Sequence, residues 1–299
     1  MSIEIGNSTT KMIEQKNILI SGGKGFIGSA LVDSLRYKNK VHVIDNMLHA
    51  PNQKELSGVI YINSSCDDIL KLKFKNIQFD YFFHLGEYSR VETSFSEIKL
   101  VFENSTKQLI NVLEFCNTNK CKLIYSASST KFTDDNIGAD LSPYAFFKAK
   151  NVEIINQYAN WTGIDYAICY FYNVFGPGES SDDHFGTVIA KFLDLYSKGH
   201  SKLPVNLPGT QRRNFTHIAD TIEALMLVAL RGQGDGFGIA SQENYSIIEL
   251  CEMLNCEPQY YPEKKGNRST SKLEIEKTIK LGWSPKHSLR EYILGHLIK

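Results

Sequence analysis

Residues 17–28 read NILISGGKGFIG, and this stretch decides the fold. Its first part, Asn17–Ser21, is a short apolar run of the kind that forms a buried strand. Three glycines follow at intervals of three residues: Gly22, Gly25 and Gly28. Glycines allow a tight turn, a close approach of the backbone to a pyrophosphate, and packing of a helix against the strand. The stretch therefore predicts a strand, a turn and a helix whose N-terminus binds phosphate groups.

An acidic residue ends the next apolar run along the chain. Asp45 follows Val41–Ile44 and lies twenty positions after Gly25, where a carboxylate accepts hydrogen bonds from an adenosine ribose. A carboxylate there also repels a 2′-phosphate, which favours NAD over NADP. Lys24 favours NADP instead, since a cation in the glycine loop can reach a 2′-phosphate. We expect Lys24 to lie in solvent and NAD to be the cofactor.

Short apolar runs alternate with longer amphipathic stretches over the first 170 residues. Such alternation is typical of βαβ units, because parallel strands need a crossover that covers the sheet. We predict an α/β fold with a Rossmann-type doubly wound parallel sheet. The expected strands are Asn17–Ser21, Val41–Ile44, Val59–Ile62, Tyr81–Leu85, Lys122–Ser126 and Tyr166–Tyr170, and the clearest helices are Ile27–Tyr37, Ile98–Asn117 and Tyr144–Thr162.

The character of the sequence changes after residues 175–178, which read FGPG. Helix-like segments then alternate with short strands and with loops that carry Gly or Pro; these segments are Thr187–Lys198, Asp220–Arg231 and Ile247–Asn255. We expect residues 16–173 to form the NAD-binding domain and 174–299 a smaller mixed α/β substrate domain, partly interleaved with the first. Residues 1–15 lack the apolar core of a signal peptide, and we expect a flexible tail.

Composition excludes several classes of protein. Apolar residues make up 42% of the 299 and charged residues 22%, as in ordinary soluble proteins. Lys plus Arg and Asp plus Glu number 33 each, so charge gives no reason to expect a nucleic-acid or membrane partner. No stretch approaches the roughly 18 apolar residues of a membrane span. The six cysteines form no CxxC and no zinc set, so we expect no metal, buried thiols and a cytoplasmic location.

A second group of residues carries hydroxyl, phenol and ammonium groups. Ser128 lies in the serine-rich end of the fifth expected strand, and Tyr144 and Lys148 are four positions apart on a helix, so they share one face. A free tyrosine has a pKa near 10, too high for a base at neutral pH, but an adjacent ammonium favours the phenolate. Ser128 can bind the same substrate oxygen. The alternative is a helix face with a packed tyrosine and a solvated lysine.

These motifs, taken in order, resemble those of the extended short-chain dehydrogenase/reductase family. The resemblance covers about residues 16–298 and is nearest to the branch of nucleotide-sugar epimerases and dehydratases. It is carried by Gly22–Gly28, Phe83–Gly86, the serines around Ser128, Tyr144–Lys148, Tyr172–Pro177, Arg213–Ile218 and Leu281–Pro285.

The resemblance implies a role for each matching residue. Tyr144 takes the proton from a sugar hydroxyl, usually at C4, Lys148 holds the cofactor ribose, and Ser128 binds the reacting oxygen. Implied cofactor contacts are Gly22, Gly25, Phe26, Ile27, Gly28, Asp45, Asn46, Leu85 and Asn104, besides Tyr144 and Lys148. Implied contacts with a nucleotide-diphosphate sugar are Ser89, Arg90, Asn173 and Arg213. A guanidinium also suits this task because it pairs bidentately with phosphate oxygens.

The sequence departs from the family pattern in several places. After the fourth strand the family has two small residues, but this chain has Gly86 and Glu87. Glu87 either reshapes the substrate side or points to solvent or to Arg90. The segment between Ser128 and Tyr144 is shorter than usual, which trims a loop at the pocket. Residues 264–268, KKGNR, stand where the family has an Arg-x-Gly-Asp stretch. The sequence therefore leaves open which of these cations contacts the diphosphate.

The choice among reactions depends on two positions. The 4,6-dehydratases of this branch carry an Asp–Glu pair where this chain has Ser129 and Thr130, so we do not expect dehydration. Two reactions share the remaining residues: 4-epimerisation through a 4-keto intermediate, and net hydride transfer by a 4-dehydrogenase or 4-ketoreductase. Overall similarity favours the epimerase. Ser128, Tyr144 and Lys148 argue against a third hypothesis, a non-catalytic NAD-binding scaffold.

Two long helical stretches, Leu100–Cys116 and Ala145–Ala159, carry apolar residues on more than one side. Five of these exceed what one face of a sheet would cover: Ile110, Leu113, Phe146, Ile154 and Ile155. Related enzymes pair such helices, and we expect a homodimer through a four-helix bundle.

Overall fold

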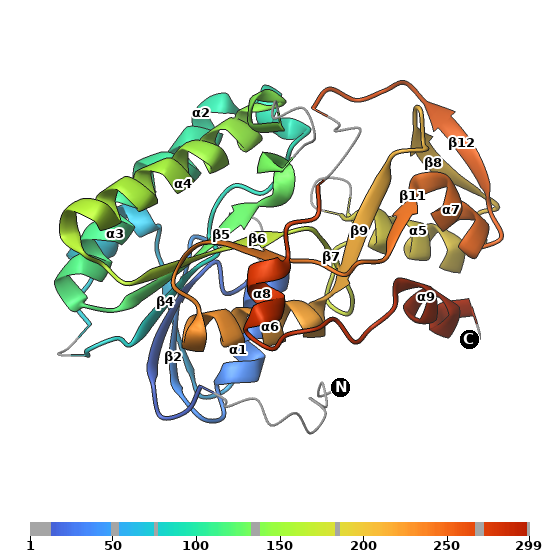
Figure 1. The fold of residues 1–299 in the computed structure, drawn as a ribbon. Helices are drawn as coiled ribbons and strands as arrows, with labels where there is room; N and C mark the ends of the chain where they lie inside the picture. The colour runs from blue at the N-terminus through green and yellow to red at the C-terminus, as the bar shows by residue number, and fades with distance from the viewer. Residues whose placement is uncertain are drawn as a thin grey trace.

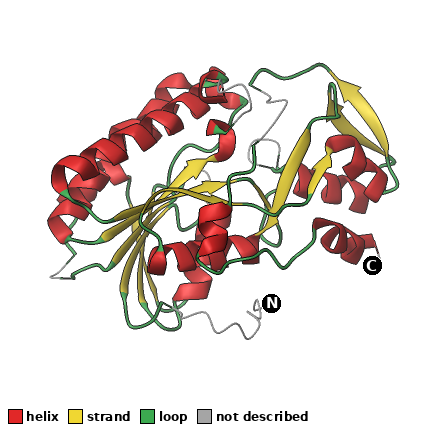
Figure 2. Ribbon diagram, viewed as in Figure 1, coloured by secondary structure: helices red, strands yellow, loops and turns green. Residues whose placement is uncertain are grey.

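The computed structural model describes residues 13–48, 54–74, 77–132, 138–182, 186–266 and 272–297. Most of the expected N-terminal tail, part of the short loop before Tyr144, and Arg268 lie outside the described residues. Seven parallel strands, six of them from the first part of the chain, form one sheet with helices on both faces (Figures 1 and 2). The predicted Rossmann-type α/β fold is confirmed.

The strand order is β10-β6-β5-β4-β1-β2-β3. The chain therefore reverses direction across the sheet between β1 and β4, and ligands of such sheets bind at the carboxyl ends of the strands beside this point. The six predicted strands are present, with ends shifted by at most two residues. They are β1 (Asn17–Ser21), β2 (Lys40–Asp45), β3 (Val59–Asn63), β4 (Tyr81–His84), β5 (Lys122–Ser128) and β6 (Tyr166–Phe171).

A seventh strand was not predicted. β10 (Gly234–Ile239) pairs with β6 in parallel, although it comes from the C-terminal part of the chain. Three of its six residues are glycines, and they interrupt the apolar run that would indicate a buried strand. The division into domains at residue 173 stays a prediction.

The helices that flank the seven-stranded sheet lie in two layers (Figure 1). α2 (Ile98–Phe102), α3 (Gln108–Asn119) and α4 (Pro143–Thr162) cover one face of the sheet, and α1 (Phe26–Leu35) and α6 (Ile218–Arg231) cover the other. The helix expected over Ile98–Asn117 is not uniform, because a π-helical segment, Glu103–Lys107, separates α2 from α3. Such widened turns are frequent at functional sites.

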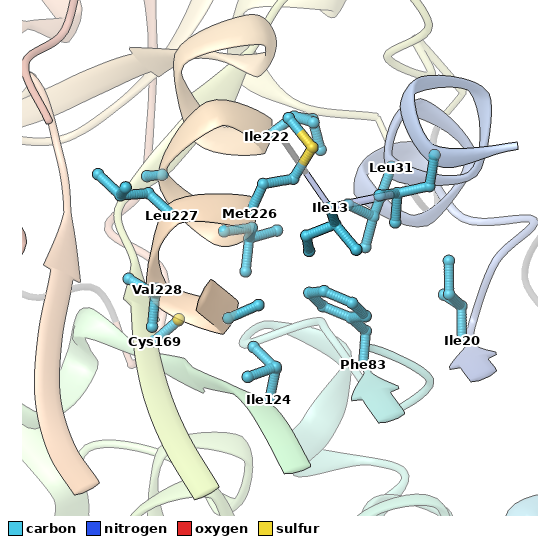
Figure 3. Close-up of a cluster of buried hydrophobic side chains, with 14 of the residues drawn as sticks. Ile13, Ile20, Leu31, Phe83, Ile124, Cys169, Ile222, Met226, Leu227 and Val228 are labelled. Atoms are coloured by element: carbon cyan, nitrogen blue, oxygen red, sulfur yellow. The ribbon is translucent and has the colours of Figure 1, made fainter. Parts of the chain in front are cut away.

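Each face of the sheet has its own apolar core. Figure 3 shows one of them, where Leu31 of α1 and Met226 of α6 lie over Phe83 and Ile124 of the sheet. On the other face, α3 and α4 contribute Leu109, Leu113 and Ile155, among others. The expectation that Leu113 and Ile155 exceed what the sheet covers is therefore wrong, and Ile154, although only partly buried, packs against the same core. The side chains left exposed on these helices include Ile98, Phe102, Ile110 and Phe146.

The C-terminal part of the chain has a separate core and two small sheets. One sheet holds β7 (Asn173–Phe175), β9 (Arg212–His217) and β11 (Asn244–Ser246); the other holds β8 (Lys202–Asn206) and β12 (Glu257–Tyr261). Their helices are α5 (Val188–Ser197), α7 (Ile247–Met253) and α9 (Leu289–Leu297), and α8 (Glu276–Lys280) lies against β10.

Two further expectations concern buried thiols and the lack of a membrane-spanning stretch. All six cysteines are free, and five are buried as expected, whereas Cys256 is partly exposed. Among the described residues, no helix combines the length and the apolar character that crossing a bilayer requires.

Candidate active site

A cavity of about 1010 Å³ opens at the carboxyl ends of the parallel strands. The glycine turn, the ends of β1, β2, β4, β5 and β6, the start of α4 and parts of the C-terminal sheets line it. The structure brings every residue predicted for the site to this cavity: Gly22, Gly25, Phe26, Ile27, Gly28, Asp45, Asn46, Leu85, Ser89, Arg90, Asn104, Ser128, Tyr144, Lys148, Asn173 and Arg213.

The glycine turn can only be built from glycines at two positions. Gly22 has a φ of +69°, and a Cβ there would lie 2.7 Å from the backbone of Gly86. A Cβ on Gly28 would lie 2.0 Å from the carbonyl oxygen of Gly22. α1 then begins at Phe26, and Gly25 before it provides no side-chain cap. The N–H groups of the first turn thus remain for a ligand, which suits the diphosphate of a dinucleotide.

Asp45 ends β2 beside this turn. Its Oδ2 accepts a hydrogen bond from the backbone N–H of Lys24 (2.9 Å), and its Oδ1 accepts one from Met47 (2.9 Å). The carboxylate is held at the cavity wall, where it suits the ribose of an adenosine. Next to it, Asn46 Nδ2 donates to Oδ1 of Asn104 at 3.4 Å, so the π-helical segment meets the end of β2.

The expectation that Lys24 lies in solvent is wrong. Lys24 is 6% exposed, its Nζ lies 3.2 Å from Oε1 of Glu55, and the ammonium lies over the ring of Tyr61. Apolar contact along the side chain and an ion pair at its end explain why a lysine can be buried here. The carboxylate of Glu55 also offsets the charge that would attract a 2′-phosphate.

The start of α4 places the phenol and the ammonium. Ser142 caps this helix by accepting a hydrogen bond from the backbone N–H of Ala145, and Pro143 occupies the first turn. Tyr144 therefore lies in the first turn at the cavity, and Lys148 follows one turn later. Lys148 is 6% exposed and its Nζ donates to the carbonyl oxygen of Ser126 at 2.6 Å, so the alternative of a solvated lysine is wrong.

Ser128 ends β5 on the same wall of the cavity. Its Oγ accepts hydrogen bonds from the backbone N–H of Thr130 (3.2 Å) and from Thr130 Oγ1 (3.0 Å). These two bonds fix the Ser128 oxygen but leave its own O–H as a donor for a ligand.

Glu87 is the residue whose place the sequence did not reveal. It is 7% exposed, and its Oε2 lies 2.7 Å from Nζ of Lys148. The Glu87 side chain therefore neither points to solvent nor pairs with Arg90, and these two alternatives are wrong. Burial alone would raise the pKa of the Glu87 carboxyl, but Lys148 and His84 outweigh burial and lower that pKa below its usual value. The sequence did carry one signal of this: after the fourth strand it has Glu87 where the family has a small residue.

The far side of the cavity offers cations and amides. Arg213 is buried on it, whereas Arg212 is exposed and pairs with Glu249 at 2.9 Å. Of the two arginines, Arg213 is therefore the buried one, and its contact with a diphosphate stays a prediction. Asn173 donates from Nδ2 to the carbonyl oxygen of Asn214 at 3.0 Å.

The stretch near residue 264 also reaches the cavity. Lys264, Lys265 and Gly266 line it, and Lys264 Nζ lies 2.7 Å from Oε2 of Glu92. Lys264 is thus engaged by a carboxylate, while Lys265 is a second cation on the same wall.

Glu179 was missed, because the segment that follows β7 was read only as a boundary. Its Oε2 accepts a hydrogen bond from the backbone N–H of Gly176 at 2.8 Å, and its Oε1 accepts one from Thr187. Burial raises the pKa of the Glu179 carboxyl to about 7. A carboxyl group that titrates near neutral pH therefore lines the cavity.

Known proteins are similar to this chain over most of its length. A putative UDP-glucose 4-epimerase of Methanocaldococcus jannaschii is 28% identical over 92% of this chain and 95% of its own. UDP-glucuronic acid decarboxylase 6 of Arabidopsis thaliana is 27% identical over 92% and 85%. The crystal structure of UDP-glucose 4-epimerase of Thermotoga maritima with UDP-glucose superposes with a TM-score of 0.86, at 25% identity over 93% and 96% of the chains.

The model of one family matches residues 18–240, which include the glycine turn, Asp45 and the Tyr144–Lys148 pair. Membership makes the protein an enzyme and NAD its cofactor, as predicted. The chain belongs to the NAD-dependent epimerase/dehydratase family.

Proposed function

We propose that the protein is a nucleotide-sugar 4-epimerase that uses NAD and forms a 4-keto intermediate. One observation carries the proposal: Ser128, Tyr144 and Lys148 line the same cavity as the glycine turn, while Ser129 and Thr130 follow Ser128. The cavity thus holds a phenol that can exchange a proton with a hydroxyl. Elimination of water would need a carboxylate pair at the positions of Ser129 and Thr130.

The chemistry assigns one task to each residue. NAD, held by the glycine turn, Asp45 and Lys148, would supply a reversible hydride acceptor for the sugar carbon. Tyr144 takes the proton of the C4 hydroxyl and later gives it back, and Lys148 favours the phenolate form by its charge. Ser128 donates its O–H to the same oxygen and stabilises the charge that develops there.

We assign binding of the nucleotide sugar to four residues that line the cavity: Arg213 and Asn173 for the diphosphate, and Ser89 and Arg90 for the sugar. A 4-epimerase must let the keto sugar turn over while its diphosphate stays anchored. Anchoring groups that come from the C-terminal sheet, apart from the glycine turn in the sequence, suit that purpose.

A 4-dehydrogenase or 4-ketoreductase is the second candidate, because it needs the same Tyr144, Lys148 and Ser128. The two reactions differ in whether the product leaves after one hydride transfer. They also differ in what happens to NAD, which an epimerase recycles and a dehydrogenase consumes.

The test is incubation of the purified protein with UDP-, GDP-, dTDP- and CDP-sugars, followed by chromatography of the products and NADH fluorescence. The proposal expects one sugar to interconvert with its C4 epimer without net formation of NADH. Net formation of NADH together with a 4-keto product would establish the second candidate. A Tyr144→Phe variant treated identically controls for contaminating enzymes.

The same proposal includes a homodimer. The exposed apolar side chains Ile98, Phe102, Ile110 and Phe146 lie on α2, α3 and α4, the helices that cover one face of the sheet. Pairing of α3 and α4 with those of a second copy would form a four-helix bundle and bury these side chains.

A further inference from the structure

A buried ion pair lies behind the proposed catalytic centre. Glu87 Oε2 is 2.7 Å from Nζ of Lys148, and the side chains of both residues are at most 7% exposed. The carboxylate also accepts hydrogen bonds from Tyr125 (2.9 Å to Oε2) and from Nδ2 of Asn151 (3.2 Å to Oε1). His84 Nε2 lies 3.2 Å from Oε1. Four side chains from β4, β5 and α4 thus surround one carboxylate.

The cluster continues to the glycine turn. His84 Nδ1 lies 2.7 Å from Oγ of Ser21, and the same Oγ accepts a hydrogen bond from the backbone N–H of Gly86 at 3.1 Å. Ser21 directly precedes Gly22. Glu87 therefore connects the ammonium of Lys148 with the base of the turn that faces the cofactor.

The ammonium of Lys148 has its counter-charge in this arrangement. An ammonium has three N–H groups, and those of Lys148 include one to Ser126 and one to Glu87, which leaves a third for the cavity. A buried ammonium without a counter-charge gives up its proton more readily, because burial disfavours the charged form. The carboxylate of Glu87 offsets that cost.

Other titratable groups around the pair do not replace Glu87. Burial raises the pKa of the Tyr125 hydroxyl well above its usual value and that of the Cys66 thiol to about 12, so both stay neutral at physiological pH. Tyr144 lies one turn before Lys148, and Arg90 is a cation near Tyr144. His84 touches the carboxylate rather than the ammonium. Among these groups, Glu87 is the anion that contacts Lys148.

We propose that Glu87 is a positioning residue, which holds Lys148 in its charged form at the place where it meets the nicotinamide ribose of NAD. The proposal rests on the role assigned to Lys148 in the proposed function, but it does not depend on which sugar reacts. The proposal also gives a physical reason why this chain has the ionisable Glu87 after β4, where the family has two small residues.

The test is calorimetric titration of the protein with NAD at a series of pH values from neutral to about pH 10, the usual range of lysine titration. In Glu87→Gln the ammonium lacks its counter-charge and loses its proton at lower pH. The affinity of both proteins for NAD should fall as pH rises. In Glu87→Gln the midpoint of this fall should lie about one pH unit or more below the wild-type midpoint. Glu87→Asp keeps the charge and should follow the wild-type curve.

Two results would overturn the proposal. One is a Glu87→Gln curve that coincides with wild type, even if the variant is less stable; the other is an equal shift in Glu87→Asp. Because NAD binding needs no sugar, a wild-type protein without epimerase activity would refute the proposed function and leave this test intact.

A second comparison covers the case in which Glu87→Gln does not fold. The double variant Glu87→Gln/Lys148→Met has neither buried charge, so it should regain most of the thermal stability that Glu87→Gln loses. A double variant no more stable than Glu87→Gln would show that the hydrogen bonds of Glu87, and not its charge beside Lys148, are what matters, which contradicts the proposal.

Discussion

The carboxylate of Asp45 accepts a hydrogen bond of 2.9 Å from the backbone N–H of Lys24. This bond joins the end of β2 to the glycine turn, so the residue that we expect to select the cofactor is bonded to the loop that we expect to bind its diphosphate. The side chain of Lys24 turns the other way, to Glu55. The local charges at this end of the cavity therefore favour a ribose without a 2′-phosphate.

Asp45→Ala should weaken NAD binding by about tenfold or more, because a hydrogen bond to a charged group contributes about 1.5–3 kcal/mol. It should also narrow the preference for NAD over NADP, which calorimetric titration with both cofactors measures. Asp68→Ala, which removes an exposed carboxylate from the segment after β3, should bind both as wild type does. A wild-type protein that prefers NADP would refute the assignment.

Glu179 should make the stability of the protein depend on pH. Its folded pKa of about 7 lies above that of an ordinary carboxyl, so the folded state keeps a proton that the unfolded chain has lost. Stability should therefore fall as pH rises from about pH 5 through about pH 7, by up to about 3 kcal/mol. Melting temperatures of Glu179→Gln should fall less over this range. Parallel curves of melting temperature against pH for wild type and Glu179→Gln would contradict the prediction. Glu153→Gln, which changes an exposed carboxyl group, is the control and should follow the wild-type curve.

The exposed face of α3 and α4 should mediate dimerisation. Ile110 is 45% exposed and Phe146 41%, and an ionised carboxylate at either position cannot be buried in a helix bundle without a large cost. Light scattering at micromolar concentration should give a dimer for wild type and a monomer for Ile110→Glu and Phe146→Glu. Ile60→Glu, on the edge strand β3, should remain a dimer. A monomeric wild-type protein would count against the bundle.

Local sequence was sufficient where one segment determines its own structure. The apolar run Asn17–Ser21, the glycines after it and Asp45 predicted the first βαβ unit, because the turn tolerates no side chain at Gly22 or Gly28. The spacing of Tyr144 and Lys148 likewise placed both residues on the cavity side of α4.

Features that depend on contacts between distant segments could not be predicted. β10 is a strand because it pairs with β6, not because its own glycine-rich sequence favours one. Lys24 is buried because Glu55 and Tyr61 approach it from elsewhere in the chain. The burial of Glu87 depends on Lys148 in the same way.

The central claim is that Tyr144 exchanges the proton of the sugar hydroxyl. Tyr144→Phe keeps the ring and its packing and removes only the hydroxyl. Tyr158→Phe makes the same change on the same helix, but the hydroxyl of Tyr158 bonds to Glu114 at 2.8 Å and Tyr158 does not line the cavity. The two variants separate the chemistry of one phenol from the effect of losing a phenol in α4.

The most direct measurement is the turnover of both variants with the nucleotide sugar that the wild-type protein converts. Turnover should fall by about 10²–10⁴-fold in Tyr144→Phe, the usual contribution of a positioned proton-transfer group, with nucleotide-sugar affinity and Tm nearly unchanged. Tyr158→Phe should keep its rate. A Tyr144→Phe protein that converts the sugar at close to the wild-type rate would contradict the account.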